Sequence, residues 1–206
     1  MNKSKVVDFY GYPLKVNRYV LTPSVETEQL ISKTINNLSD FKNPKIADIG
    51  TGSGCIGISL KKEIECNVTL VDISNKALEV AEENAKDNDA EVELLLGSFL
   101  EPLKGKYDCI ISNPMYLSYG DDVAEIVAPS EPVIAHYSGT DGLACYDAIL
   151  SNAREHLKKK FLIAFQLGTT PIIPLKKKIK KYFPHAEVWI EQDMKKRDMF
   201  IFIKEG

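Results

Sequence analysis

The sequence predicts a single α/β domain built on a mostly parallel, seven-stranded sheet that ends in an antiparallel hairpin. Three observations predict this fold. Short β-branched and apolar runs alternate with helical stretches along most of the chain. The last two β runs, 186–192 and 198–204, follow each other without a helix, so they must pair antiparallel. A chain of 206 residues with 44% apolar side chains is long enough to bury one sizeable core.

The elements follow from periodicity and from turn residues, in chain order. Residues 1–44 precede the alternating pattern and are expected to pack on it, with a small hairpin over 6–20 around Gly11 and a helix over 26–38. Residues 45–206 form the domain proper, a single structural unit. Before its final hairpin, strands are expected at 45–49, 67–73, 91–97, 107–112 and 161–167, and helices at 55–62, 75–88, 143–157 and 174–182.

Composition excludes several classes of protein. No apolar run approaches the roughly 18–20 residues that a membrane helix needs, and the N-terminus lacks the apolar segment of a secretory signal. The four cysteines are widely spaced, with no metal-binding pattern, and are expected to be reduced thiols. We therefore expect a cytoplasmic protein without a metal site. We also expect the protein to be a monomer.

Charge is distributed unevenly along the chain. Residues 1–150 carry 13 basic and 23 acidic side chains, whereas residues 151–206 carry 13 and 6. The basic excess lies in three runs, at 158–160, 176–181 and 195–197. Such a face could meet RNA, an acidic protein or the ribosome, but a solvated helix surface is the favoured interpretation. No aromatic residues for base stacking are interleaved with the runs, so no stable nucleic-acid complex is expected.

A glycine-rich loop lies between the first predicted strand of the domain and its helix. Residues 48–54 read Asp-Ile-Gly-Thr-Gly-Ser-Gly, and glycines in such a loop let a ligand approach the backbone closely. Gly52, Gly54 and Gly57 match a dinucleotide fingerprint, with Asp72 about 20 residues further on. That frame leaves Asp48 and Gly50 without a role.

A second frame uses all of these residues. Asp48 ends the first strand, Gly50, Gly52 and Gly54 form the turn, and Asp72 ends the second strand, where an acid can bind both hydroxyls of a ribose. A carboxylate beside the loop would repel a pyrophosphate but attract a cation. S-adenosylmethionine carries a sulfonium, an ammonium and a ribose, and it is therefore the predicted cofactor. A purely structural glycine turn is the alternative.

The second motif, Asn113-Pro114-Met115-Tyr116, follows the fourth predicted strand of the domain. The carboxyl end of a parallel strand faces the ligand crevice of an open α/β sheet. The Asn113 side-chain oxygen and the Pro114 carbonyl could accept both N–H bonds of an NH₂ group and direct its lone pair toward a methyl carbon. Tyr116 would stack on a planar substrate group. Alone, Asn-Pro is more often a turn.

Together these motifs resemble the catalytic domain of bacterial release factor glutamine methyltransferases. The resemblance runs nearly end to end and rests on the segments 9–11, 21–30, 48–60, 71–74, 97–103, 112–116, 131–135, 139–143 and 192–198. It implies a Rossmann-like class I methyltransferase fold and transfer of a methyl group from S-adenosylmethionine to a glutamine side-chain nitrogen. A peptide-chain release factor is the implied partner.

The resemblance also implies roles for individual residues. Asn113, Pro114 and Tyr116 would be catalytic, and with Met115 and Glu131 they would bind the substrate. Glu131 could equally form a salt bridge that holds its loop. The residues expected at the cofactor are Thr27, Asp48, Gly50, Thr51, Gly52, Asp72, Ile73, Ser98, Phe99 and Asn113.

The sequence departs from the family pattern in four ways. Met115 replaces a second proline, Ser24-Val25 replaces Arg-Pro, and Gln166 replaces a glutamate. The N-terminal helical domain of the bacterial members is not visible either. Three other interpretations therefore stay open: methylation of a small amide or amine, methylation of an adenine exocyclic amine, and a cofactor-binding interaction module without activity.

Overall fold

The computed structural model describes residues 4–114 and 142–206. Its strands in the main sheet are β3 (Lys45–Ile49), β4 (Asn67–Asp72), β5 (Glu93–Leu96), β6 (Tyr107–Ser112), β7 (Leu157–Gln166), β8 (Glu187–Gln192) and β9 (Asp198–Glu205). They form one seven-stranded sheet in the order β5-β4-β3-β6-β7-β9-β8. Strands β3 to β7 pair in parallel, and β9 lies antiparallel between β7 and β8. The predicted sheet is confirmed.

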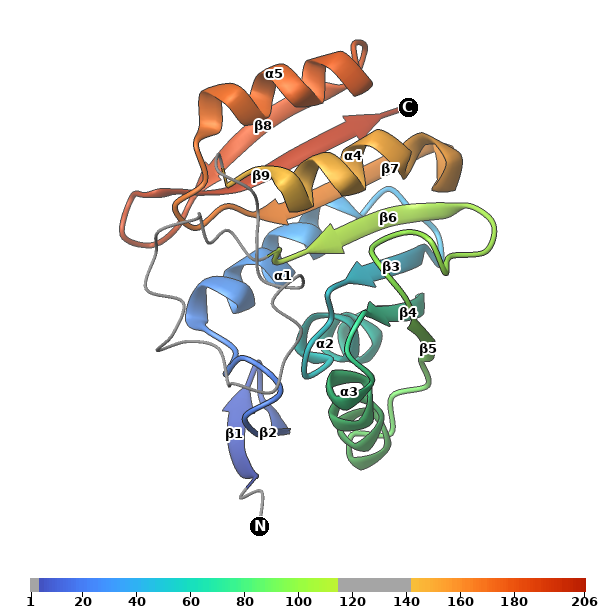
Figure 1. Ribbon diagram of the computed structural model, residues 1–206, viewed down its shortest axis with the longest axis vertical. Helices are drawn as coiled ribbons and strands as arrows, with labels where there is room; N and C mark the ends of the chain where they lie inside the picture. The colour runs from blue at the N-terminus through green and yellow to red at the C-terminus, as the bar shows by residue number, and fades with distance from the viewer. Residues whose placement is uncertain (1–3, 115–141) are drawn as a thin grey trace.

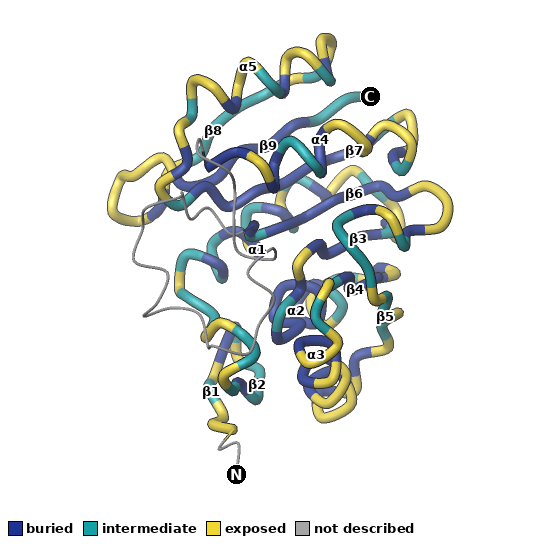
Figure 2. Tube along the Cα trace, in the orientation of Figure 1, coloured by how far each residue is buried: buried dark blue, intermediate teal, exposed yellow. Residues whose placement is uncertain are grey.

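Helices cover both faces of this sheet (Figure 1). They are α1 (Val25–Asn37), α2 (Cys55–Glu63), α3 (Asn75–Asp87), α4 (Ala144–His156) and α5 (Ile172–Tyr182). One apolar cluster joins α1, α2 and α3 to the sheet, and a second joins α4 and α5 to the opposite face. The central strands are buried on both sides, whereas the outer faces of the helices are exposed (Figure 2). Burial on both faces explains why these strands read as continuous apolar runs.

The N-terminal segment forms a separate two-stranded sheet of β1 (Lys5–Phe9) and β2 (Tyr12–Val16). Its turn contains Gly11, at φ 80°, as the sequence predicted. Asn84 of α3 holds this hairpin: its Oδ1 accepts the Lys15 N–H at 2.7 Å, while its Nδ2 donates to the carbonyls of Lys15 and Ser53. Because Ser53 belongs to the glycine loop, the hairpin and the loop share one anchor. A boundary after residue 44 stays a prediction.

Several predicted boundaries need correction. The hairpin ends at residue 16 and not at 20, and β5 is shorter than the predicted strand 91–97. Strand β7 begins at Leu157, so the lysines at 158–160 lie at the start of a strand and not on a helix. Lys158 pairs with Asp108 at 2.7 Å and Lys160 with Asp40 at 2.7 Å. Lys158 and Lys160 therefore belong to ion pairs within the protein.

The cysteine side chains lie in the protein interior. All four cysteines are free and buried, and burial raises the pKa of Cys55 to about 12, so its thiolate is not populated at neutral pH. Within the two described ranges, no helix is long and apolar enough to cross a membrane.

Candidate active site

The candidate site lies at the carboxyl edge of the parallel strands. From β3 the chain winds outward through β4 to β5 on one side, and β6 and β7 lie on the other side of β3. Ligands of open α/β sheets bind where the strand order reverses in this way. Asp48 in β3 is paired with Ile111 in β6, two residues before Asn113. The two main sequence motifs therefore meet at the point where a ligand is expected.

The glycine loop turns back on the protein. Its glycines Gly50, Gly52 and Gly54 have φ values of 70°, 56° and 81°, a region that L side chains rarely adopt. The amides of Gly50 and Thr51 donate to the Val71 carbonyl at 2.8 and 3.0 Å, and the Gly52 amide donates to Asp72 Oδ2 at 2.9 Å. A pyrophosphate cradle needs such amides for its ligand. Their use within the protein disfavours the dinucleotide interpretation.

Gly57 completes the dinucleotide pattern for a different reason. A Cβ atom on this residue would lie 2.2 Å from Leu70 Cδ2 and 2.9 Å from Val68 Cγ1. Glycine is therefore required for α2 to pack closely on β4. The match of Gly52, Gly54 and Gly57 to the fingerprint reflects helix packing and carries no information about the ligand.

Asp48 is a fully buried carboxylate at the start of this loop. Its Oδ2 accepts hydrogen bonds from the Thr51 hydroxyl at 2.6 Å and the Gly57 amide at 3.1 Å. Its Oδ1 is buried without a hydrogen-bond partner in the described part of the chain. Burial raises the pKa of Asp48 to about 7, and the nearby Asp72 carboxylate adds to this rise. A buried carboxylate oxygen without a partner can be stabilised by a cationic ligand. Asp48 therefore fits an ammonium or sulfonium group better than a phosphate.

Asp72 ends β4 beside the loop and is half-buried. Its Oδ1 accepts the Ser74 amide at 2.9 Å, and its Oδ2 accepts the Gly52 amide. The fixed orientation of the carboxylate suits recognition of the two hydroxyls of a ribose.

Three further residues expected at the cofactor, Ile73, Ser98 and Phe99, lie next to Asp72 in the chain or in the loop after β5. Ile73 is 48% exposed, although it is apolar and adjoins a buried strand. The Gly97 amide donates to the Asp72 carbonyl at 3.0 Å, which places the loop of Ser98 and Phe99 beside the end of β4. Phe99 has φ 47°, which is strained for an aromatic residue and typical of functional loops. The exposed Ile73 side chain could contact the base of a nucleoside, and the adjacent Asp72 carboxylate could bind its ribose.

Asn113 lies directly after β6 and contacts α1. Its Nδ2 donates to the Thr27 hydroxyl at 3.4 Å, and that hydroxyl donates to Gln166 Oε1 at 3.0 Å. Thr27 is thus brought to Asn113, and its predicted contact with the cofactor stays a prediction. Ser24 caps α1 by accepting the Thr27 amide at 3.3 Å, so the residue in place of the family's arginine has a structural use.

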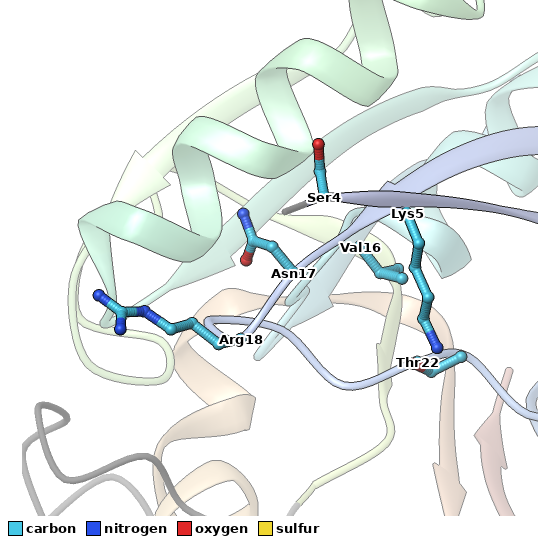
Figure 3. A pocket seen from close by; sticks show the side chains of 6 residues that line it. All are labelled: Ser4, Lys5, Val16, Asn17, Arg18 and Thr22. Carbon is cyan, nitrogen blue, oxygen red and sulfur yellow. The ribbon is translucent and has the colours of Figure 1, made fainter. Parts of the chain in front are cut away.

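Three predicted site residues lie outside the described part of the chain, and one pocket lies away from the residues described above. Met115, Tyr116 and Glu131 are outside the described residues, and Pro114 is the last described residue before them. A pocket lined by Lys5, Arg18 and four smaller side chains lies at the N-terminal hairpin (Figure 3). None of its lining residues was predicted at the site, and the side chains of Lys5 and Arg18 point in different directions. It does not form a cluster of converging groups.

Sequence reasoning missed the role of Gln166. The sequence showed only that Gln166 replaces a glutamate of the family pattern at the end of β7. No neighbouring residues in the sequence connected Gln166 with Asn113 or Thr27. Its side chain is buried at 4% exposure, and the Tyr146 hydroxyl donates to its backbone carbonyl at 2.7 Å. The structure therefore adds Gln166 to the hydrogen-bonded group of Asn113 and Thr27.

Comparison with solved structures shows a methyltransferase fold. A ribosomal protein methylase from Lactobacillus delbrueckii subsp. bulgaricus superimposes with a TM-score of 0.63 at 20% identity, covering 91% of this chain and 81% of that one. A 16S rRNA methyltransferase from T. Thermophilus, solved with AdoMet and guanosine, gives 0.69 at 12% identity, covering 99% and 50%.

Sequence comparison defines the family. The methyltransferase small domain family matches residues 27–129. A release factor glutamine methyltransferase from Bacillus cereus is 37% identical over 203 residues, covering 94% of this chain and 72% of the relative. The Streptococcus pneumoniae enzyme of the same name is 36% identical, covering 97% and 72%. With this identity over nearly its whole length, the chain belongs to the release factor glutamine methyltransferase family, whose members are S-adenosylmethionine-dependent methyltransferases.

Proposed function

We propose that this chain methylates the side-chain amide nitrogen of a glutamine in a peptide-chain release factor. The observation that carries the proposal is the fixed position of Asn113 beside the glycine loop, with its Nδ2 bonded to Thr27. In that orientation the Asn113 Oδ1 is left as an acceptor for a substrate N–H. The names of the relatives support a release factor as the substrate.

Cofactor binding is assigned to the loop and to the ends of β4 and β5. Asp48, Gly50, Thr51 and Gly52 would hold the methionine end, with the buried Asp48 Oδ1 facing a cationic group. Asp72 would bind the ribose, and Ile73, Ser98 and Phe99 would enclose the adenine. S-adenosylmethionine supplies an electrophilic methyl group on a sulfonium.

Asn113 and Pro114 would act by orienting the substrate. An amide nitrogen is a poor nucleophile because its lone pair is delocalised into the carbonyl. Two fixed acceptors, the Asn113 Oδ1 and the Pro114 carbonyl, would hold both N–H bonds and direct that lone pair at the methyl carbon. Tyr116 and Met115 would complete the substrate site, with Glu131 in its wall. Such catalysis needs no general base with a shifted pKa.

The experiment is a methyl-transfer assay with a recombinant release factor, in which peptide mass spectrometry reads the mass and position of the product. Asn113→Ala should abolish turnover while leaving cofactor affinity nearly unchanged, because the lost acceptor acts mainly in the transition state. Asn152→Ala, the same substitution on the exposed face of α4, serves as the matched control. Near-normal kcat in Asn113→Ala would reduce the Asn-Pro-Met-Tyr segment to a turn.

The proposal extends to the setting of the reaction. We expect a cytoplasmic monomer that meets its protein substrate without forming a stable complex with nucleic acid. A panel of small amides, amines and adenine-containing oligonucleotides in the same assay tests the other acceptors. Methylation of one of these, with an unmodified release factor, would replace the proposed substrate.

A further inference from the structure

We infer that Thr27 and Gln166 are positioning residues that determine which end of the Asn113 amide faces the substrate. This inference rests on the proposed function, in which the Asn113 Oδ1 must accept an N–H bond. An asparagine amide presents an acceptor at one end and donors at the other. A flipped Asn113 would present its NH₂ group to the substrate NH₂ group and could not hold it.

Three segments that are remote in sequence build this control. Asn113 follows β6, Thr27 lies in the first turn of α1, and Gln166 ends β7. Asn113 and Thr27 are separated by 86 positions, and Thr27 and Gln166 by 139. Thr27 is 2% exposed and Gln166 is 4% exposed. Because both side chains are shielded from water, their hydrogen bonds have few competing partners.

The Thr27 hydroxyl links the orientation of the Gln166 amide to that of the Asn113 amide, because it has a single proton to donate. A hydroxyl donates one hydrogen bond and accepts up to two. Thr27 donates to Gln166 Oε1 at 3.0 Å, so toward Asn113 and Ser24 it can act only as an acceptor. Asn113 must then turn its Nδ2 toward Thr27 and its Oδ1 away. The 3.4 Å contact to Asn113 is the longest of the three, and catalytic contacts of this kind often shorten only when substrate is bound.

Gln166 is the residue on which this orientation depends. If its amide were flipped, Gln166 would donate to Thr27, and Thr27 could then donate to Asn113 Oδ1. An ionised carboxylate at position 166 could not take part in that reversal, because it only accepts. Gln166 therefore sets the orientation of Asn113 only while its Oε1 faces Thr27. Gln166→Glu tests this directly, because an ionised carboxylate presents an acceptor in either orientation.

The strongest test removes the hydroxyl of Thr27 while keeping its shape. Thr27→Val should lower kcat on the release factor by about 10- to 100-fold, the scale expected for misplaced catalytic groups. Thr27→Ser should restore most of kcat because it keeps the hydroxyl. Thr34→Val is the matched control: Thr34 is buried in the same helix, and its hydroxyl has no partner in the described part of the chain.

Gln166→Glu adds a readout that a structural role would not change. With the introduced carboxylate ionised, kcat should stay at or above the wild-type value. As pH falls, the protonated carboxyl group at position 166 of the variant could donate to Thr27, so kcat of Gln166→Glu should fall in a pH range where wild-type kcat is flat. Parallel profiles of the two proteins, or equal losses in Thr27→Val and Thr34→Val, would overturn the inference.

A second measurement separates this inference from the proposed function. The side-chain NH₂ resonance of Asn113 in a ¹H–¹⁵N spectrum can be assigned by its loss in Asn113→Ala. Thr27→Val should shift this resonance and speed its hydrogen exchange, whereas Thr34→Val should not. If wild-type protein leaves release factors unmethylated, the proposed function fails and this spectrum still decides the inference. An unchanged Asn113 resonance in Thr27→Val would overturn it.

Discussion

Replacing Asp48 with asparagine should stabilise the ligand-free protein at pH 8 and weaken its response to cofactor. Burial raises the pKa of Asp48 from 3.8 to about 7, about 3 units, each worth about 1.4 kcal/mol. The ionised side chain therefore costs about 4 kcal/mol above neutral pH. The asparagine carbonyl can still accept from Thr51 and Gly57, but its NH₂ group would be buried without a clear partner, at a cost of about 1–3 kcal/mol. The net gain expected is about 1–3 kcal/mol.

The pH dependence has a definite sign. Between about pH 4 and pH 7 the folded protein keeps a proton on Asp48 that the unfolded chain has lost, so the free energy of unfolding falls as pH rises. The variant lacks this contribution, so its advantage over wild type should be absent at pH 4 and full at pH 8. Urea unfolding at several pH values measures the difference. A cofactor-induced rise in melting temperature should shrink in the variant. A variant less stable than wild type at pH 8 would refute the reasoning.

Three further changes test other parts of the site. Asp72→Ala should weaken S-adenosylmethionine binding by about 1–3 kcal/mol in calorimetry, since it removes charge-assisted hydrogen bonds, and NAD should show no binding; tight NAD binding would contradict this. Gly57→Ala should lower the free energy of unfolding by about 1–3 kcal/mol, because its Cβ would clash with Leu70; unchanged stability would show that α2 can shift. Met115→Pro should preserve or raise kcat/KM on a release factor by pre-ordering the segment, and a loss there would indicate that Met115 suits a different substrate.

Much of the fold and part of the site could be predicted from the sequence, because the signals were local. Apolar runs and helical periodicity located the strands and helices to within a few residues. The motif at 48–54 begins in the last two residues of β3, so the positions of Asp48 and its glycines followed once that strand was recognised. Asp72 at the end of β4 followed from the same argument. The lysines at 158–160 misled because a charged run has no period that separates a strand from a helix.

Tertiary structure alone decided what the first turn of α1 does. Glu26 pairs with Arg197 at 2.8 Å, Thr27 bonds to Asn113 and Gln166, and the Tyr10 amide donates to Glu28 Oε1 at 2.8 Å. These partners lie 18 to 171 positions away, so no local pattern of residues could have revealed them. The sequence by itself determined which chemical groups the carboxyl edge of the sheet carries. Only the packing of α1 against β6 and β7 decided how Asn113 is held, because hydrogen-bond orientation depends on side chains that meet after the chain has folded.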